Sequence, residues 1–305
     1  GLRLEISAAT HFSKRDLKIS WPEMTGTDTF DLLVEGLGSR GLEVECKSIS
    51  EDKGRKIHRR DILDFYALLW PNLSAVRDGL SVGLAAVLTI PGRLPTQYKD
   101  RKELAKNVCA QVLIGKNANL ANGASIRFSE FDAKLLNPSI LTTNQQELRK
   151  TLDSLTGAIN REAMLIGTSV GGALALAVKS ADDDALMTAT FNTLSDSAKR
   201  QFTGNRGGMF LVGLHGLTAE QLRSIAAQDV DISQESTALR LAVSKFLSGS
   251  GRDHVIGVGF LSESDLISID ELTVESGGTA YFFPKRESSL WSNDFTGLFS
   301  WANHD

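Results

Sequence analysis

The spacing of hydrophobic positions alternates along the chain between the periods of helices and of strands. Apolar residues every three to four positions predict helices, and period-two alternation or short apolar runs between turn formers predict strands. The predicted helices cover residues 2–14, 57–70, 99–114, 144–159, 182–202, 219–228 and 235–248. The predicted strands cover residues 29–35, 42–49, 80–90, 124–131, 163–166, 173–179, 209–214, 255–261, 266–274 and 279–283. This mixture predicts an α/β (mixed α+β) protein whose central mixed sheet is flanked by helices.

A glycine-rich turn joins the first two strands. Residues 36–41 (GLGSRG) separate TFDLLVE from LEVECKSI, which is the pattern of a β-hairpin. Side chains alternate between the faces of a strand, so Glu45 and Lys47 are predicted to project together to one side while Val44 and Cys46 enter the core.

Asp31 interrupts an otherwise apolar strand. Phe30, Leu32 and Val34 are predicted to share one face, with Asp31 pointing the other way. The hairpin can bring Asp31 beside Glu45, and two neighbouring carboxylates repel each other unless a cation lies between them. Oxygen ligands of this kind suit Mg²⁺, and a lysine two residues further along can hold the attacking water or neutralise charge on a phosphate.

These residues resemble the PD-(D/E)xK nuclease superfamily, which includes restriction endonucleases and Holliday-junction resolvases. Asp31 matches the acidic residue on one strand, and Glu45-Cys46-Lys47 matches D/E-x-K on the next. The resemblance implies a Mg²⁺- or Mn²⁺-dependent endonuclease acting on nucleic acid, with DNA as the expected substrate. Asp31, Glu45 and the Cys46 carbonyl would be the metal ligands, Lys47 would orient the water, and Glu5 matches a further catalytic glutamate on the preceding helix.

The chain departs from the family pattern in one place. Phe30 stands where the family has proline before the aspartate, which leaves Asp28 as a rival for the first ligand. The resemblance implies a restriction endonuclease-like core, expected over residues 1–135, because a helix and a strand follow Lys47 in the family's order. Residues 136–305 are then expected to form a C-terminal α/β accessory region, which could supply target choice, homodimer contacts or a protein-binding surface.

A basic run follows the proposed site directly. It begins a predicted helix, and cations at a helix N-terminus favour phosphate binding. The residues expected to contact the nucleic-acid backbone are Lys53, Arg55, Lys56, Arg59 and Arg60.

A second motif supports a different enzyme. Residues 167–171 (GTSVG) satisfy G-x-S-x-G, and in an α/β serine hydrolase Ser169 would occupy a sharp turn between a strand and a helix. Asp231 and His254 would complete a triad. The apolar residues 173–178 read instead as a strand, which favours a glycine hairpin. A non-catalytic module that binds nucleic acid or protein is the third alternative.

Composition narrows these classes only slightly. The 305 residues are 42% hydrophobic and 23% charged, with a net charge of −4, as expected of a globular protein that does not coat nucleic acid non-specifically. The longest apolar stretch, residues 80–90, is too short to cross a bilayer, and no secretory signal is recognised, so no membrane association is expected. The two cysteines, Cys46 and Cys109, fit a reducing cytoplasm.

Overall fold

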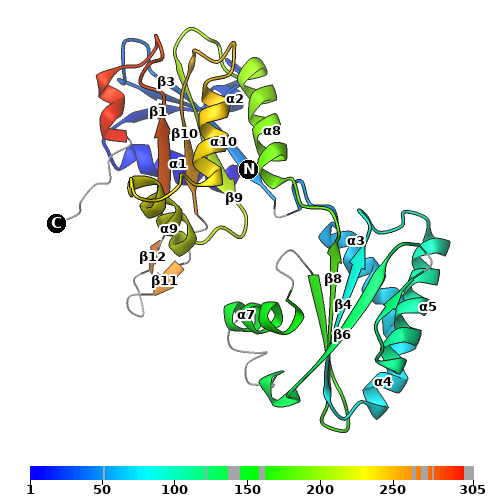
Figure 1. Ribbon diagram of the computed structural model, residues 1–305. Helices are drawn as coiled ribbons and strands as arrows, with labels where there is room; N and C mark the ends of the chain where they lie inside the picture. The colour runs from blue at the N-terminus through cyan, green and yellow to red at the C-terminus, as the bar shows by residue number, and fades with distance from the viewer. Residues whose placement is uncertain are drawn as a thin grey trace. The chain divides into compact units, whose positions relative to one another are not determined.

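A computed structural model describes residues 1–50, 52–120, 122–136, 145–157, 162–262, 266–268, 274–276 and 278–298. The chain forms two compact units (Figure 1). Unit 1 comprises Gly1–Gly54 together with Leu186–Asp305, and unit 2 comprises Arg55–Ala185. Each unit has a mixed sheet with helices on both faces, so the predicted fold class is confirmed at this level.

The sheet of unit 1 has six strands in the order β1-β2-β3-β9-β10-β13. The strands are β1 (Lys18–Ser20), β2 (Leu32–Glu35), β3 (Leu42–Ile49), β9 (Gly207–Leu214), β10 (Val255–Leu261) and β13 (Ala280–Pro284). The first three strands are antiparallel neighbours, and β3, β9 and β10 run parallel. The pairing of β3 with β9 extends over the whole length of β3, so the centre of this sheet joins segments far apart in the sequence.

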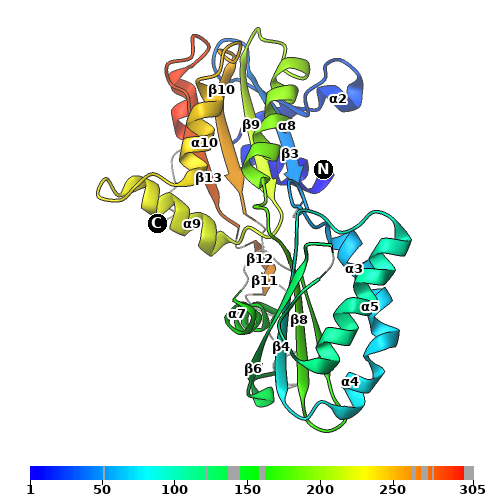
Figure 2. The same ribbon diagram turned by 45° about the vertical axis from the view of Figure 1, so that its right-hand side comes forward.

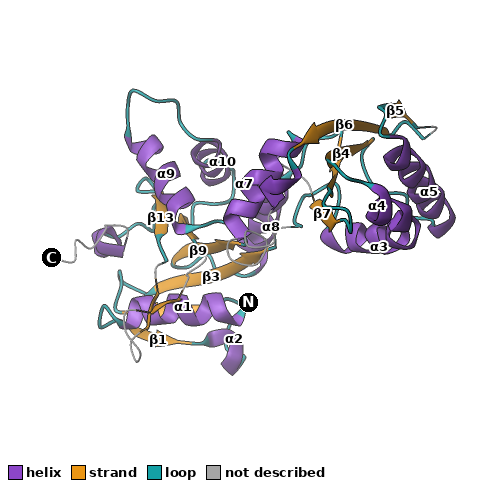
Figure 3. Ribbon diagram, turned by 90° about the horizontal axis from the view of Figure 1, so that it is seen from below, coloured by secondary structure: helices purple, strands orange, loops and turns teal. Residues whose placement is uncertain are grey.

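Helices cover both faces of this sheet (Figure 3). One face packs against α1 (Leu2–Ser13), with Phe12 among its fully buried side chains. The other face packs against α8 (Leu186–Arg200), α9 (Ala219–Val230) and α10 (Ala238–Leu247). The described part of unit 1 also contains α2 (Pro22–Thr25), η3 (Asn293–Leu298) and a separate antiparallel pair of strands, β11 (Leu266–Ser268) and β12 (Val274–Ser276).

Unit 2 has a five-stranded sheet of its own (Figure 2). The order β5-β6-β4-β8-β7 comprises β5 (Ala118–Asn119), β6 (Ser125–Phe131), β4 (Gly83–Ile90), β8 (Ala173–Ser180) and β7 (Glu162–Gly167). One face is covered by α3 (Arg59–Leu69), η1 (Trp70–Leu73), α4 (Ser74–Gly79) and α5 (Tyr98–Ile114). The other face is covered by α7 (Gln145–Thr156), and η2 (Ala133–Leu136) follows β6.

The two units differ from the predicted division into residues 1–135 and 136–305. That boundary falls inside unit 2. The physical reason is strand pairing: β3 takes β9 as its parallel neighbour, whereas β4 pairs with β8 in the other sheet. The C-terminal half therefore completes the sheet that carries Glu45, rather than forming a separate region, and unit 2 is inserted between β3 and α8.

Most predicted elements are present within a few residues, and β3 has the bounds that its alternation predicts. The predicted strand over 266–274 is described only as β11 and the start of β12, since 269–273 lie outside the described residues, as do the ends of the predicted 144–159 helix. Pro71 ends α3 as predicted, and the chain continues as the short helix η1. No helix in the described ranges is both long and apolar enough to cross a membrane.

Candidate functional site

Strand β3 carries two acidic side chains on the face opposite α1. Val44 and Cys46 pack into the apolar cluster with α1, which confirms their predicted direction. Glu43 and Glu45 are 0% and 1% exposed, so these carboxylates are not the solvated charges of an ordinary strand surface. Lys47 lies with its Nζ 2.5 Å from Oε1 of Glu45, which confirms that these two side chains project together.

Asp31 lies at the point where the hairpin opens. Leu32 pairs with Val44, so Asp31, one residue before β2, comes opposite Glu45. The backbone N–H of Cys46 donates a hydrogen bond of 2.6 Å to Oδ2 of Asp31. If β2 began earlier, a backbone carbonyl of β2 would accept this N–H. The Asp31 carboxylate accepts it instead.

The predicted start of this strand is wrong. Residues 29–31 form a bend, and β2 begins only at Leu32. Phe30 packs into the cluster on the α8 face, whereas Leu32 and Val34 pack on the α1 face. Because of the bend, Phe30 lies on the other face of the sheet from Leu32 and Val34, and Asp31 is not part of the β2–β3 backbone pairing.

The early end of β2 leaves part of the β3 edge without a partner strand. Residues of a hydrogen-bonded antiparallel pair turn both N–H and C=O toward their neighbour. Because the Cys46 N–H points toward Asp31, its carbonyl oxygen faces the same edge. Asp31 and the Cys46 carbonyl therefore lie at one opening in the sheet, with Glu45 adjacent along β3.

Burial and neighbouring acids disfavour the charged forms of both carboxyl groups. Burial raises the pKa of Asp31 to about 6; the Cys46 hydrogen bond opposes this rise, while a hydrogen bond with Glu23 and the charge of Glu5 add to it. Burial raises the pKa of Glu45 to about 7, against the effect of Lys47 and with a further contribution from Asp31. The charge of Asp31 thus raises the proton affinity of Glu45, as expected of closely spaced acids.

Two further acids act on Asp31. Glu5, on α1, was predicted as a fourth member, and its charge raises the pKa values of both Asp31 and the Cys46 thiol. Its helix lies close to the sheet because Gly213 has no side chain where Leu4 packs; an added Cβ would be 3.3 Å from Leu4 Cδ1. Glu23 was missed by sequence reasoning, although Pro22-Glu23 is a recognisable helix start.

Asp28, the rival for the first ligand, lies elsewhere. Its charge raises the pKa of Glu43, whereas Asp31 is the aspartate that acts on Glu45. Glu43 accepts hydrogen bonds from the backbone N–H and the hydroxyl of Thr203, and Arg206 Nε lies 3.2 Å from its Oε1. Glu43 is therefore a structural ion-pair partner rather than a free ligand.

Two observations bear on whether a cation fits these residues. Within the described ranges, no three His, Cys, Asp or Glu side chains are already arranged to hold a metal ion. Conversely, Oε2 of Glu45 is buried without a hydrogen-bond partner, beside a second buried carboxylate. A buried oxygen of this kind requires an explanation, and hard oxygen donors of Asp31, Glu45 and the Cys46 carbonyl fit Mg²⁺ or Mn²⁺ in chemistry. The unpartnered oxygen of Glu45 favours a cation, because a small rotation of the carboxyl groups can bring their oxygens onto an ion.

The basic run does not form a single set of exposed cations. Arg55 NH1 lies 2.8 Å from Glu162, and Lys56 Nζ lies 3.4 Å from Asp182, so both are paired within unit 2. Lys53 belongs to unit 1, while the exposed Arg59 and Arg60 begin α3 of unit 2.

The G-x-S-x-G segment does not have the geometry of a nucleophile elbow. It connects β7 to β8 as an antiparallel hairpin, with Gly167 paired to Ala173, so a strand and not a helix follows Ser169. The Ser169 hydroxyl donates to the Arg77 carbonyl at 3.2 Å. The hairpin interpretation is confirmed, and the serine hydrolase alternative loses its structural basis.

A histidine lies at the same end of the sheet as Lys47. His215 follows β9, donates its backbone N–H to the Ile49 carbonyl at 3.0 Å, and has Nε2 3.0 Å from the Ser48 hydroxyl. The pairing of His215 with Ser48 depends on the parallel contact of β3 with β9, which no local sequence pattern indicates.

Comparison with known proteins gives no relative: no family model, curated protein or solved structure matches this chain.

Proposed function

We propose that this protein is a metal-dependent nuclease that hydrolyses phosphodiester bonds, with DNA as the first substrate to test. The observation that carries the proposal is the opening in the sheet where Asp31 lies opposite Glu45, beside the Cys46 carbonyl. Two buried acids side by side are costly to a fold unless they serve a ligand.

The order of elements in unit 1 supports the same proposal. Apart from the short elements β1 and α2, helix α1 is followed by the β2–β3 hairpin, and the next elements of unit 1 are helix α8 and strand β9, which lies parallel to β3. This is the helix–hairpin–helix–strand order implied by the resemblance to PD-(D/E)xK nucleases. The helix and strand after β3 are α8 and β9, instead of the predicted segments 57–70 and 80–90, because unit 2 is inserted between them.

The residues of the site have distinct roles in the proposed reaction. Asp31, Glu45 and the Cys46 carbonyl would hold Mg²⁺ or Mn²⁺, which supplies a Lewis acid for the phosphate oxygens. Lys47 can hold the attacking water through one of its three N–H donors and offset negative charge that grows on phosphorus. Glu45, which already contacts the Lys47 ammonium, fixes the position of that side chain.

A matched pair of variants tests the proposal. Asp31→Asn keeps an oxygen acceptor for the Cys46 N–H and removes the charge, whereas Asp28→Asn changes an acid that acts on Glu43. Cleavage of end-labelled single-stranded and duplex DNA is measured with Mg²⁺, with Mn²⁺ and with EDTA. We expect metal-dependent cleavage that Asp31→Asn and Lys47→Ala reduce at least a hundred-fold and that Asp28→Asn retains.

Two outcomes would contradict the proposal. Cleavage that survives Asp31→Asn would place the reaction elsewhere. Salt-sensitive DNA binding without cleavage, unchanged by Asp31→Asn, would indicate the non-catalytic binding module.

A further inference from the structure

Ser48 and His215 form a hydrogen-bonded pair at the end of β3, directly beyond Lys47. Nε2 of His215 lies 3.0 Å from Oγ of Ser48, and both residues are exposed. The backbone N–H of His215 donates to the Ile49 carbonyl at 3.0 Å, so the register of β9 against β3 fixes where the imidazole begins. The proposed reaction gives neither side chain a role, although Ser48 is the next residue after the lysine that it requires.

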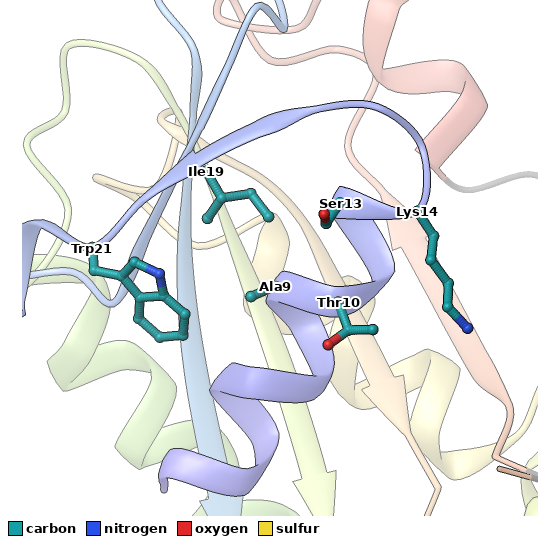
Figure 4. A pocket seen from close by; sticks show the side chains of 6 residues that line it. All are labelled: Ala9, Thr10, Ser13, Lys14, Ile19 and Trp21. Carbon is teal, nitrogen blue, oxygen red and sulfur yellow. The ribbon is translucent and has the colours of Figure 1, made fainter. Parts of the chain in front are cut away.

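The hollow between α1 and β1 has no comparable arrangement of polar groups (Figure 4). It measures about 410 Å³ and has Lys14 and Trp21 in its lining. In Figure 4 the Lys14 side chain turns away from Trp21, so these groups do not converge on one point. Ser48 and His215, in contrast, point at each other and extend the strand that carries two of the candidate metal ligands.

The edge of β3 beside Ser48 is the same edge that holds the candidate metal site. β2 pairs with only the first three residues of β3, and in the described part of the chain no other strand continues along this edge. The Ile49 carbonyl turns toward β9, so by alternation the backbone groups of Cys46 and Ser48 turn toward the edge where Asp31 lies. Ser48 lies two residues, about 7 Å, beyond Cys46. A nucleic-acid strand that follows the edge away from the metal ligands therefore meets Ser48 next.

Ser48 and Lys47 approach this edge from opposite faces of the sheet, because consecutive residues of a strand alternate. Lys47 contacts Glu45 on the face opposite α1, whereas Ser48 shares the α1 face with Cys46. The proposed reaction assigns Lys47 to the scissile phosphate. Ser48, on the other face and about 7 Å beyond Cys46, is therefore placed for the phosphate next to it on the same strand.

The hydrogen bond with His215 determines whether the Ser48 hydroxyl can bind a phosphate. Serine hydroxyls are among the groups that contact phosphate oxygens, but a hydroxyl has one O–H donor and these oxygens only accept. The O–H of Ser48 is left for the phosphate when Nε2 of His215 carries a hydrogen and donates it to Oγ. We propose that the Ser48 hydroxyl binds the phosphate next to the scissile one and that His215 is a positioning residue which donates to this hydroxyl, an inference that rests on the proposed function.

Steady-state cleavage of end-labelled DNA by the full chain in Mg²⁺ tests these roles through the split between KM and kcat. Ser48→Ala removes the hydroxyl, and Ser48→Thr keeps it. His215→Leu removes the imidazole N–H, and His215→Gln keeps an N–H donor on a side chain of similar reach. The matched controls are Ser50→Ala, which changes an exposed serine two residues further along, and His58→Leu, which changes an exposed histidine of unit 2.

We expect Ser48→Ala to raise KM about ten- to thirty-fold while kcat changes less than about three-fold, because a contact to a phosphate that does not react is lost equally from the ground state and the transition state. Ser48→Thr, His215→Gln and both controls should stay within about three-fold of the unaltered protein. His215→Leu should raise KM about five-fold. The double variant Ser48→Ala/His215→Leu should match Ser48→Ala alone, because His215 acts only through the hydroxyl.

A circular-dichroism melt confirms that each variant is folded. An unchanged KM in Ser48→Ala would overturn the inference, as would a fall in kcat at constant KM. Effects on KM that multiply in the double variant would overturn the positioning role of His215. If DNA is not cleaved, the same ratios are measured as Kd, from the anisotropy of a fluorescein-labelled DNA strand in Ca²⁺. Binding that depends on Ser48 would then contradict only the proposed nuclease function, whereas equal binding or none would overturn this inference as well.

Discussion

The ammonium nitrogen of Lys47 lies 2.5 Å from Oε1 of Glu45, while the other oxygen of the same carboxylate is buried with no partner. The Lys47 ammonium therefore contacts only one of the two oxygens of the Glu45 carboxylate, which is 1% exposed. Taking a charge out of water is favourable only when both partners and their remaining lone pairs are satisfied. The second Glu45 oxygen thus has no partner, which favours a second cation at this position. The stability of unit 1 should therefore depend on whether Glu45 is charged.

Removal of Lys47 should expose that dependence. We expect Lys47→Met to lower the free energy of unfolding by about 3 kcal/mol at pH 8, because Glu45 is left charged and unpaired. At pH 5.5, below the Glu45 pKa of about 7, the loss should be much smaller. Urea denaturation at both pH values measures it. The control is Lys18→Met, whose surface pair with Glu35 should contribute at most about 1 kcal/mol; an equal loss for both variants would contradict the argument.

Neutral replacements of the acids should have the opposite effect on stability. The pKa values of Asp31 and Glu45 are raised to about 6 and about 7 in the folded chain, above the ordinary 3.8 and 4.5. Between about pH 4 and 7 the folded state binds more protons than the unfolded state, so this contribution to stability is present at low pH and is lost as pH rises through the folded values.

Asp31→Asn and Glu45→Gln should therefore be more stable than the unaltered protein at pH 8 in EDTA, by about 1 to 3 kcal/mol, and nearly equal to it at pH 4.5. Differential scanning calorimetry in matched buffers measures the difference. Variants that are destabilised at pH 8 would show that these carboxylates support the fold rather than a ligand. A gain in stability together with a loss of cleavage is the pattern expected of functional residues.

The hairpin and the chemistry of its strand could be predicted from the sequence because they depend on local alternation. Glu45, Lys47 and Cys46 lie on the faces that period two assigns to them. The partner of β3 could not be predicted, since its pairing with β9 closes a loop of more than 150 residues and leaves no local pattern. Glu23 was missed because its relevance comes from the bend at residues 29–31, which moves Asp31 next to α2.

Metal binding should depend on pH around the pKa values of Asp31 and Glu45. A carboxylate must lose its proton to bind Mg²⁺, and the two candidate ligands have pKa values of about 6 and about 7. We expect Mn²⁺ affinity, measured by isothermal titration calorimetry, to rise at least ten-fold between pH 6 and pH 8, with protons released to the buffer. Titrations in two buffers of different ionisation enthalpy count those protons. No release at pH 6 would mean that Asp31 and Glu45 are not the ligands. Asp31→Asn should weaken Mn²⁺ binding and lower the number of protons released, leaving the part that comes from Glu45.

Substitution of Glu43 distinguishes an effect on stability from an effect on metal binding, because Glu43 precedes Glu45 by two residues on the same face of β3. Its carboxylate is already satisfied by Thr203 and Arg206, whereas Glu45 retains an orphaned oxygen. Glu43→Gln should lower the free energy of unfolding by about 1.5 to 3 kcal/mol through weakened charge-assisted hydrogen bonds. At a temperature where the variant remains folded, Mn²⁺ affinity and the rate of DNA cleavage should change less than about three-fold. Glu45→Gln should do the reverse, keeping or raising stability at pH 8 while abolishing metal binding. If Glu43→Gln abolished metal binding in a folded protein, the metal site would have to be moved along β3 toward Thr203.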